Sequence, residues 1–193
     1  MRQREKAKLR KEMLKRRSSM SKKQVQTLSD KIIATLTKFP IFTDGKNIMT
    51  YLSFNNEINT FNLIKHCMEN NKRVIVPYCE ERNIRIIPSE IKDMSKELVK
   101  NKFGFYEPKH DYLRPFNHNN IDMIIVPGLA FDKRCYRIGF GKGYYDRFLS
   151  RIKPEIPTIG LAYSFQIVDR ILEEDFDVPL DYVITEKKII VKG

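Results

Sequence analysis

Tryptophan is missing from this chain of 193 residues, and cysteine and histidine occur only three times each. The cysteines have neither paired nor metal-like spacing, so we expect them to be reduced thiols of a cytoplasmic protein: Cys67, Cys79 and Cys135. The histidines form no His-x-x-His or His-Glu-x-x-His pattern, which argues against a zinc site: His66, His110 and His118.

Long apolar runs are also missing. Stretches such as Met123–Val126 are far shorter than the roughly 20 residues that a helix needs to cross a bilayer, so we expect no membrane partner. The N-terminus is basic, but no apolar segment follows it, so we expect no secretory signal.

Acidic residues are scarce at one end of the chain. The formal net charge is +12, and residues 1–23 alone hold eleven basic and two acidic side chains, a net +9. Such an excess suggests an anionic partner: nucleic acid, a membrane surface, or a phosphorylated or polycarboxylate small molecule. The length predicts a single domain over residues 1–193, carrying a basic N-terminal helix over residues 4–17.

Helical and strand patterns alternate along the rest of the chain. Ser21-x-x-Gln24 predicts a capping box for a helix that ends at Pro40, and Thr60 is expected to cap another. Two strands are expected to end at Pro77 and Pro88. The predicted strands are 47–53, 73–76, 84–87, 121–126, 158–162, 182–185 and 188–191.

This alternation indicates an α/β fold, with helices in outer layers on both faces of a mostly parallel central sheet, as in Rossmann-like proteins. In such sheets, ligands bind beyond the carboxyl ends of the strands. We therefore expect site residues just after Ser53, Val76, Val126 and Ala162.

The segment Gly139–Arg147 (GFGKGYYDR) is the most informative part of the sequence. Three of the eight glycines fall at alternate positions, directly before a predicted helix. Glycines let backbone N–H groups approach a ligand, and the helix N-terminus adds positive potential, so the loop suggests a phosphate site. It matches neither the Walker A nor the Gly-x-Gly-x-x-Gly pattern, and an ordinary flexible turn is the alternative.

Together with Val126–Asp132, the block Arg137–Arg147 resembles the signature of the 5-formyltetrahydrofolate cyclo-ligases, also called 5,10-methenyltetrahydrofolate synthetases. Three weaker blocks agree in order: Lys6–Arg10, Tyr51–Thr60 and Asp177–Glu186. The resemblance runs over almost the whole chain. It implies a three-layer αβα fold of the NagB/RpiA/CoA transferase-like architecture.

The activity that this resemblance implies is an ATP-dependent ring closure. 5-Formyltetrahydrofolate, which can carry a polyglutamate tail, and ATP become 5,10-methenyltetrahydrofolate, ADP and phosphate, with Mg²⁺ as cofactor. The resemblance implies a cytoplasmic enzyme, expected to be a monomer, without a nucleic-acid or membrane partner. Position and charge neutralisation would carry such a phosphoryl transfer.

Residue roles follow by the same resemblance. Lys142, Arg137 and Tyr145 would be catalytic. Leu52, Glu57 and Tyr144 would bind the folate, and Asp146 and Asp181 would serve as magnesium ligands. The nucleotide would be bound by a larger set: Lys6, Arg10, Arg137, Ile138, Gly139, Phe140, Gly141, Lys142, Gly143, Tyr144 and Tyr145.

Each role has an ordinary structural alternative. Lys6 and Arg10 would also suit a solvated basic helix, and Asp146 would suit the first turn of any helix. Asp181 and Glu57 would also suit surface positions, and the pair Tyr144–Tyr145 could simply pack at a helix start.

The chain departs from the family pattern at three positions of this region, of which Ile138 in place of a usual Leu is a mild change. Cys135 stands where glycine is common, and a cysteine adopts positive φ only at a cost, so we expect the turn there to differ. Phe140 stands where some members carry Arg, so a polar contact of that Arg would be lost.

Two other classes of protein compete with the cyclo-ligase hypothesis. A nucleic-acid-binding protein is supported only by the basic N-terminus, because the body lacks a recognisable nucleic-acid motif. An α/β enzyme of a sugar phosphate or a coenzyme A thioester would share the sheet but would not need the ATP loop. Nucleotide affinity after loss of the N-terminal basic residues would separate the first class from a cyclo-ligase.

Overall fold

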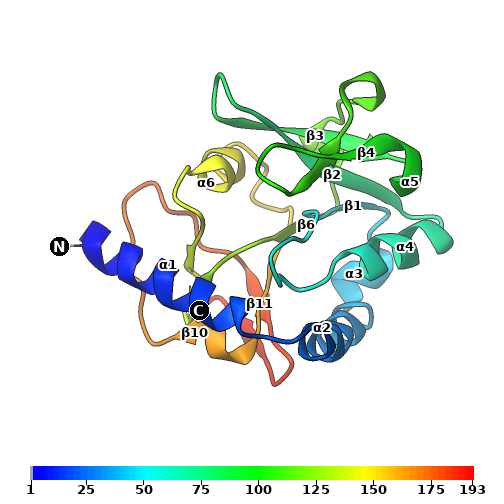
Figure 1. Cartoon of the computed structure of the whole chain (residues 1–193). Helices are drawn as coiled ribbons and strands as arrows, with labels where there is room; N and C mark the ends of the chain where they lie inside the picture. Colours follow the sequence, from blue (N-terminus) through cyan, green and yellow to red (C-terminus); the bar gives the residue numbers. More distant parts are fainter. Residues whose placement is uncertain (1) are drawn as a thin grey trace.

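A seven-stranded, mostly parallel sheet lies at the centre of the protein (Figure 1) in a computed structural model that describes residues 2–193. Neighbouring strands are parallel except at the two edges, where β12 and β3 run antiparallel. In spatial order the strands are β12 (Ile189–Val191), β11 (Tyr182–Ile184), β9 (Thr158–Leu161), β6 (Met123–Val126), β1 (Asn47–Met49), β2 (Arg73–Glu80) and β3 (Arg85–Ile91).

Helices cover both faces of this sheet, which confirms the predicted α/β fold class. The helices are α1 (Arg2–Ser18), α2 (Lys22–Leu36), α3 (Pro40–Asp44), α4 (Phe61–Glu69), α5 (Met94–Glu97) and α6 (Tyr144–Leu149), and three 3₁₀ turns lie at His110–Tyr112, His118–Asn120 and Ser164–Gln166. One small sheet pairs β4 (Leu98–Lys100) with β5 (Tyr106–Pro108). A second small sheet is made of β10 (Ile167–Val168), β7 (Ala130–Asp132) and β8 (Arg137–Ile138).

Alternating side chains of the central strands build two separate cores. On β6, Met123 and Ile125 pack with α2, α3 and α4, whereas Ile124 and Val126 pack with α6 on the opposite face. This is the period-two alternation of a strand that is buried on both sides. The continuous apolar run of β6 therefore reports a central strand, as its sequence predicted.

Several local signals act as expected, and two do not. Ser21 forms the predicted capping box with Gln24 at the start of α2. That helix ends at Leu36, and Pro40 instead begins α3, where a missing N–H costs nothing. Thr60 does not cap α4 with its side chain, because its hydroxyl donates to the Tyr51 carbonyl at 2.7 Å.

The expectation that Pro77 and Pro88 end their strands is wrong. Both lie within β2 and β3, and they face each other in the antiparallel register. The Pro88 carbonyl accepts from the Phe116 N–H, and the carbonyl of Ile75, two residues before Pro77, accepts from Thr50 N–H. The backbone polar groups at both prolines therefore point away from the β2–β3 pairing, so no hydrogen bond between these two strands is lost.

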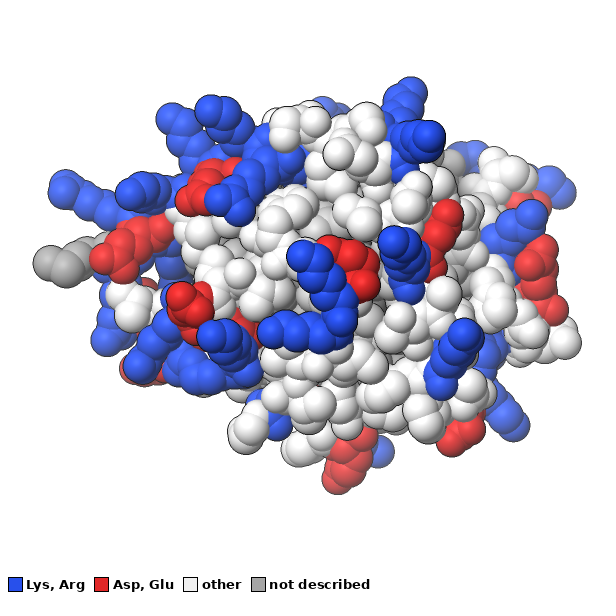
Figure 2. All heavy atoms as spheres, turned by 90° about the horizontal axis from the view of Figure 1, so that it is seen from below, with Lys and Arg blue, Asp and Glu red and all other residues white. Residues whose placement is uncertain are grey.

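Helix α1 packs across the carboxyl ends of the parallel strands rather than projecting as a free arm. Met13 is buried against Leu129 and Ile138, and Lys6 and Arg17 are buried as well. Figure 2 shows Lys and Arg side chains crowded at the end of the molecule where α1 begins, with acidic side chains among them. None of the helices within residues 2–193 is both long and apolar enough to span a bilayer.

Ile84 closes the β2–β3 hairpin in a left-handed conformation, with φ of 47°. A β-branched residue is strained there, and the side chain is 40% exposed, so its packing compensates little. We expect Ile84→Gly to stabilise the protein by about 0.5–1 kcal/mol and to raise the melting temperature by about 1–4 °C. Calorimetry checks this, with Ile84→Val as the control that keeps the strain; a lower melting temperature for the glycine variant contradicts it.

Candidate active site

One large cavity, of about 1150 Å³, lies beyond the carboxyl ends of β1, β2 and β6. Residues after three of the four expected strand ends reach it, and those after β9 do not. Its walls come from α1, the segment after β1, the β2–β3 hairpin, residues 101–107, the glycine loop and the segment 174–177. The cavity therefore gathers groups from almost the whole length of the chain.

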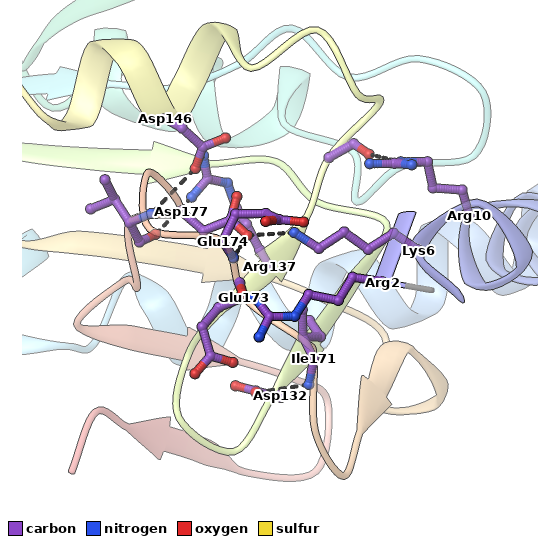
Figure 3. A network of polar contacts seen from close by, with 12 residues as sticks. Arg2, Lys6, Arg10, Asp132, Arg137, Asp146, Ile171, Glu173, Glu174 and Asp177 are labelled. Carbon is purple, nitrogen blue, oxygen red and sulfur yellow. Dashed lines mark hydrogen bonds and ion pairs between the residues drawn. The ribbon is translucent and has the colours of Figure 1, made fainter. Parts of the chain in front are cut away.

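The glycine loop connects β8 to α6 along one wall of the cavity. Gly141 and Gly143 have φ of 100° and 67°, so both need the freedom that glycine provides. The Arg10 guanidinium packs over Gly141 and donates to the Gly139 carbonyl at 2.9 Å. The loop and the N-terminal helix, which the sequence predicted to share a ligand, thus lie side by side (Figure 3).

Lys6 reaches the same cavity from one turn earlier on α1. Its ammonium group forms a 2.5 Å ion pair with Asp177, and both side chains are largely buried. The Asp177 carboxylate also accepts from the Glu174 backbone N–H at 2.9 Å. Lys142, on the glycine loop, is exposed and lies 5.1 Å from the centre of the Phe103 ring. The cations predicted to face phosphates, Lys6, Arg10 and Lys142, therefore line the same cavity.

Arg137 and Asp146 form a second ion pair beneath the loop. Nη2 of Arg137 lies 3.0 Å from Oδ1 of Asp146, and Nη1 donates to the Val178 carbonyl. Burial lowers the pKa of Arg137 and the neighbouring Asp146 opposes this, while the guanidinium stays charged. Ile138 lines the cavity next to this pair.

The structure does not bring Asp181 to the cavity, which corrects its assignment as a magnesium ligand. Its carboxylate accepts from both the N–H and the hydroxyl of Thr158, and it pairs with Lys192 at 2.7 Å. Burial acts to raise the pKa of Asp181, but these partners outweigh it and hold the pKa below its usual value. Asp181 is thus a structural residue at the start of β11.

Asp177 lines the cavity together with Asp146, and both carboxylates act on the buried Arg137. Within residues 2–193, no group of three or more His, Cys, Asp or Glu side chains could hold a metal ion by itself. Mg²⁺ commonly uses one or two protein carboxylates and takes its other oxygens from phosphates and water. The donor set fits such a shared ion, with Asp146 and Asp177 as its protein side.

Leu52 and Glu57 line the part of the cavity that follows β1, as predicted. Glu57 is 7% exposed, and burial raises its pKa to about 7, although Arg17 and the Phe54 N–H lower it. It is therefore an interior carboxyl group rather than a surface one.

Aromatic side chains form the wall beside Glu57. Phe54 lies with its ring centre 5.6 Å from that of Phe105 and 5.5 Å from that of Phe140. Phe103 stacks on Phe105 at 6.3 Å. A flat heteroaromatic ligand would bind well against such rings. Phe140, one of the departures from the family pattern, thus contributes to an apolar wall instead of a polar contact.

The two tyrosines that open α6 differ in their surroundings. Tyr145 has the one buried side-chain polar atom without a hydrogen-bond partner among the residues that the structure describes, its hydroxyl oxygen. Its pKa is raised well above the usual value by burial, so the group is a neutral donor. Tyr144 also lines the cavity. An unsatisfied phenol in a cavity is available to a bound ligand.

Cys135 adopts a left-handed conformation with φ of 64°, although we expected the turn to change where glycine is common. Its side chain is fully buried in the core beside α6, and its carbonyl accepts from the Leu180 N–H. Packing and hydrogen bonding thus hold a backbone conformation that glycine would adopt without strain.

Three contributions to the site were missed from the sequence. Asp177 stands in the sequence only as part of a C-terminal block, and Arg17 has no predicted role. Phe103 and Phe105 belong to a run that resembles a family loop near the folate, but they are outside the predicted site because aromatic clusters are more often core. For the phenylalanines the sequence did hold a signal of a binding surface, because the run Phe103–Tyr106 contains three aromatic residues and a glycine. For Asp177 and Arg17 only the fold reveals the partner.

These features define the class of the protein: an α/β protein with a cavity for small ligands at the carboxyl ends of its parallel strands. At about 1150 Å³ the cavity is large for a small-ligand pocket, which typically measures roughly 300–1000 Å³. A sequence model of the 5-formyltetrahydrofolate cyclo-ligase family matches residues 2–186. The chain therefore belongs to the 5-formyltetrahydrofolate cyclo-ligase family and is an enzyme of that class.

Individual relatives agree over nearly their full lengths. A 5-formyltetrahydrofolate cyclo-ligase of Escherichia coli is 28% identical, covering 90% of this chain and 96% of the relative. A solved 5,10-methenyltetrahydrofolate synthetase of Aquifex aeolicus superposes with a TM-score of 0.83 at 34% identity, covering 96% of this chain and 92% of the other. A second solved synthetase, from Mycoplasma pneumoniae, gives 0.77 at 30% identity, covering 94% and 98%.

The raised pKa of Glu57 makes a prediction about stability. A group whose pKa is about 7 when folded and about 4.5 when unfolded favours folding below pH 4.5, and this contribution is lost as the pH rises through 7. From pH 4.5 to pH 8, the free energy of unfolding of Glu57→Gln should therefore rise relative to that of the wild type by up to about 3 kcal/mol. Urea unfolding at both pH values measures the gap; Glu69→Gln, at an exposed position, is the control. An unchanged gap for Glu57→Gln would contradict the assignment.

Proposed function

We propose that this enzyme converts 5-formyltetrahydrofolate and ATP to 5,10-methenyltetrahydrofolate, ADP and phosphate. The main support is that one cavity combines a glycine loop, converging cations and an aromatic wall with an interior carboxyl group. The first two suit a nucleotide triphosphate, and the last two suit a pterin. Family membership supplies the name of the reaction.

The chemistry needs position and charge more than a nucleophilic side chain. The formyl oxygen attacks the γ-phosphorus of ATP, the bond to the β–γ bridging oxygen breaks, and ADP leaves. N10 of the folate then attacks the activated carbon, loses its proton, and phosphate departs with the former formyl oxygen. Lys6, Arg10 and Lys142 would neutralise the phosphates, and Tyr145 would donate a hydrogen bond to the reacting group.

Asp146 and Asp177 would hold the Mg²⁺ that accompanies ATP, with the phosphates completing its shell. When bound, the ion would offset phosphate charge. One oxygen of Asp146, Oδ1, is already bound by Arg137 and the Val178 N–H. In residues 2–193 its other oxygen, Oδ2, has no hydrogen-bond partner and is the one left for a cation.

Glu57 would accept hydrogen bonds from the N–H donors of the pterin edge, and Leu52 and Tyr144 would pack against the folate. Since α1 supplies Lys6 and Arg10 to the same cavity as the body, we propose that the chain acts as a single catalytic unit. One copy carries all the groups named, and a monomer in the cytoplasm stays our prediction.

The deciding assay combines the protein, Mg-ATP and 5-formyltetrahydrofolate. We expect methenyl product, followed by its absorbance, with one ADP released per ring closed, and no product when ATP is omitted. Folded protein that releases neither product contradicts the proposal. ADP released from a sugar or a coenzyme A acceptor, without methenyl product, would favour a different α/β enzyme.

Removing the cavity cations should weaken nucleotide use. We expect Lys6→Ala and Lys142→Ala each to lower kcat/KM for ATP by at least tenfold, because each removes a charge near the phosphates. Lys11→Ala, an exposed position on α1, should change it less than twofold. Steady-state kinetics with varied ATP measures this. Equal effects of all three would point to the overall charge of the helix rather than to a site.

A further inference from the structure

Arg17 is a cation that the proposed chemistry does not use, although it is 1% exposed. It lies one residue before the end of α1. A buried charge is costly unless it is paired and hydrogen-bonded. Its partners should therefore show what it does.

The first partner is a turn that precedes Glu57. Nε and Nη2 of Arg17 both donate to the Asn55 carbonyl, at 3.2 and 3.0 Å. In return, the Asn56 side chain donates to the carbonyls of Arg17 and Met20. Asn55 and Asn56 both have positive φ, 47° and 57°, a conformation that asparagine tolerates better than most residues. The end of α1 and this turn are thus bonded in both directions.

The second partner is Glu57 itself. Nη1 of Arg17 lies 3.6 Å from Oε1 of Glu57, and the Phe54 N–H donates to Oε2 at 3.1 Å. The other titratable groups that face this carboxyl are phenols: Tyr51 after β1, Tyr145 on α6 and Tyr163 after β9. Among residues 2–193, Arg17 is the cation that acts on it.

Arg17 also touches the glycine loop. Its guanidinium carbon lies 5.9 Å from the centre of the Phe140 ring, and Phe140 packs against Phe54 in the cavity wall. The same buried cation thus contacts the carboxyl group proposed to bind the pterin and an aromatic ring beside it.

We propose that Arg17 is a positioning residue for folate: it fixes the Asn55–Glu57 turn and favours the carboxylate form of the Glu57 side chain, which lines the cavity. The inference rests on the proposed function, since it names the reason for the charge. A protonated Glu57 would carry an O–H donor and fewer acceptor sites for the N–H donors of the pterin, and the anion accepts the stronger hydrogen bonds, so recognition favours the anion.

Two substitutions separate the charge from the hydrogen bond. Arg17→Gln keeps a donor for the Asn55 carbonyl and removes the charge, whereas Arg17→Lys keeps the charge. For Arg17→Gln we expect at least a tenfold higher KM for 5-formyltetrahydrofolate at pH 7, a less than twofold change in KM for ATP, and an acidic limb of kcat/KM shifted upward by at least one pH unit. Arg17→Lys should leave that limb in place. Arg16→Gln, on the exposed side of α1, is the matched control.

A double substitution tests the coupling. Arg17→Gln combined with Glu57→Gln should bind folate no worse than Glu57→Gln alone, because the carboxylate that Arg17 serves is gone. Additive losses, or an acidic limb that does not move in Arg17→Gln, would overturn the proposal. Should Arg17→Gln not fold, Arg17→Met is the second neutral variant. If neither Arg17→Gln nor Arg17→Met folds, and adding Glu57→Gln does not restore folding, the proposal is also overturned, because Arg17 would then serve the turn alone.

A direct titration distinguishes this inference from the proposed function. Carbon NMR of labelled glutamate carboxyl groups, assigned with Glu57→Gln, follows Glu57 without turnover. We expect Glu57 to titrate at higher pH in Arg17→Gln than in the wild type. An unmoved titration overturns the inference even in an active enzyme. If the titration of Glu57 moves in Arg17→Gln but the wild type forms no methenyl product, the electrostatic role of Arg17 is retained and the folate reaction is rejected.

Discussion

The attachment of helix α1 by buried cations is the interaction on which the site depends. The helix has little apolar surface to bury, and Met13 is its one fully buried hydrophobic side chain. Its position comes instead from Lys6 with Asp177, Arg10 with the Gly139 carbonyl, and Arg17 with the Asn55 carbonyl and Glu57. Each bond joins α1 to a different wall of the cavity, so helix, glycine loop and turn are positioned together.

Using charges for this attachment couples structure to ligand binding. Lys6 now neutralises Asp177, and an arriving phosphate and its cation would compete for both partners. Arg17, deeper in the protein, has no such competitor and keeps its bonds to the turn. Helix α1 therefore carries one cation that can bind a ligand, Lys6, and one that stays bonded to the protein, Arg17. The bonds that these cations make to the body are the reason why a helix so rich in charge packs against it.

The sheet contributes by placing several loops at one edge. β1, β2 and β6 run parallel and adjacent, so the segments that follow them open on the same side. The predicted order of elements placed Glu57 just past a strand end, and in the structure Glu57 lines the same cavity as the glycine loop. Asp181 was assigned from the family resemblance instead, and the fold places it away from the cavity. It lies before its strand, at the opposite end of the sheet from the cavity, and its bonds to Thr158 hold it there. The prolines of β2 and β3 were misjudged because only the register shows which way their missing donors point.

What the sequence determined by itself was local chemistry. Gly141 and Gly143 specified a loop that needs positive φ, Ser21 and Gln24 specified a helix start, and the apolar run of β6 specified a central strand. Only the tertiary structure decided which charges are buried and with what partners. Asp177 lies 171 residues from Lys6 and Arg17 lies 38 from Asn55. Pairing across such separations depends on the packing of the whole chain, and burial alone turned Glu57 from a loop acid into a group with a pKa near 7.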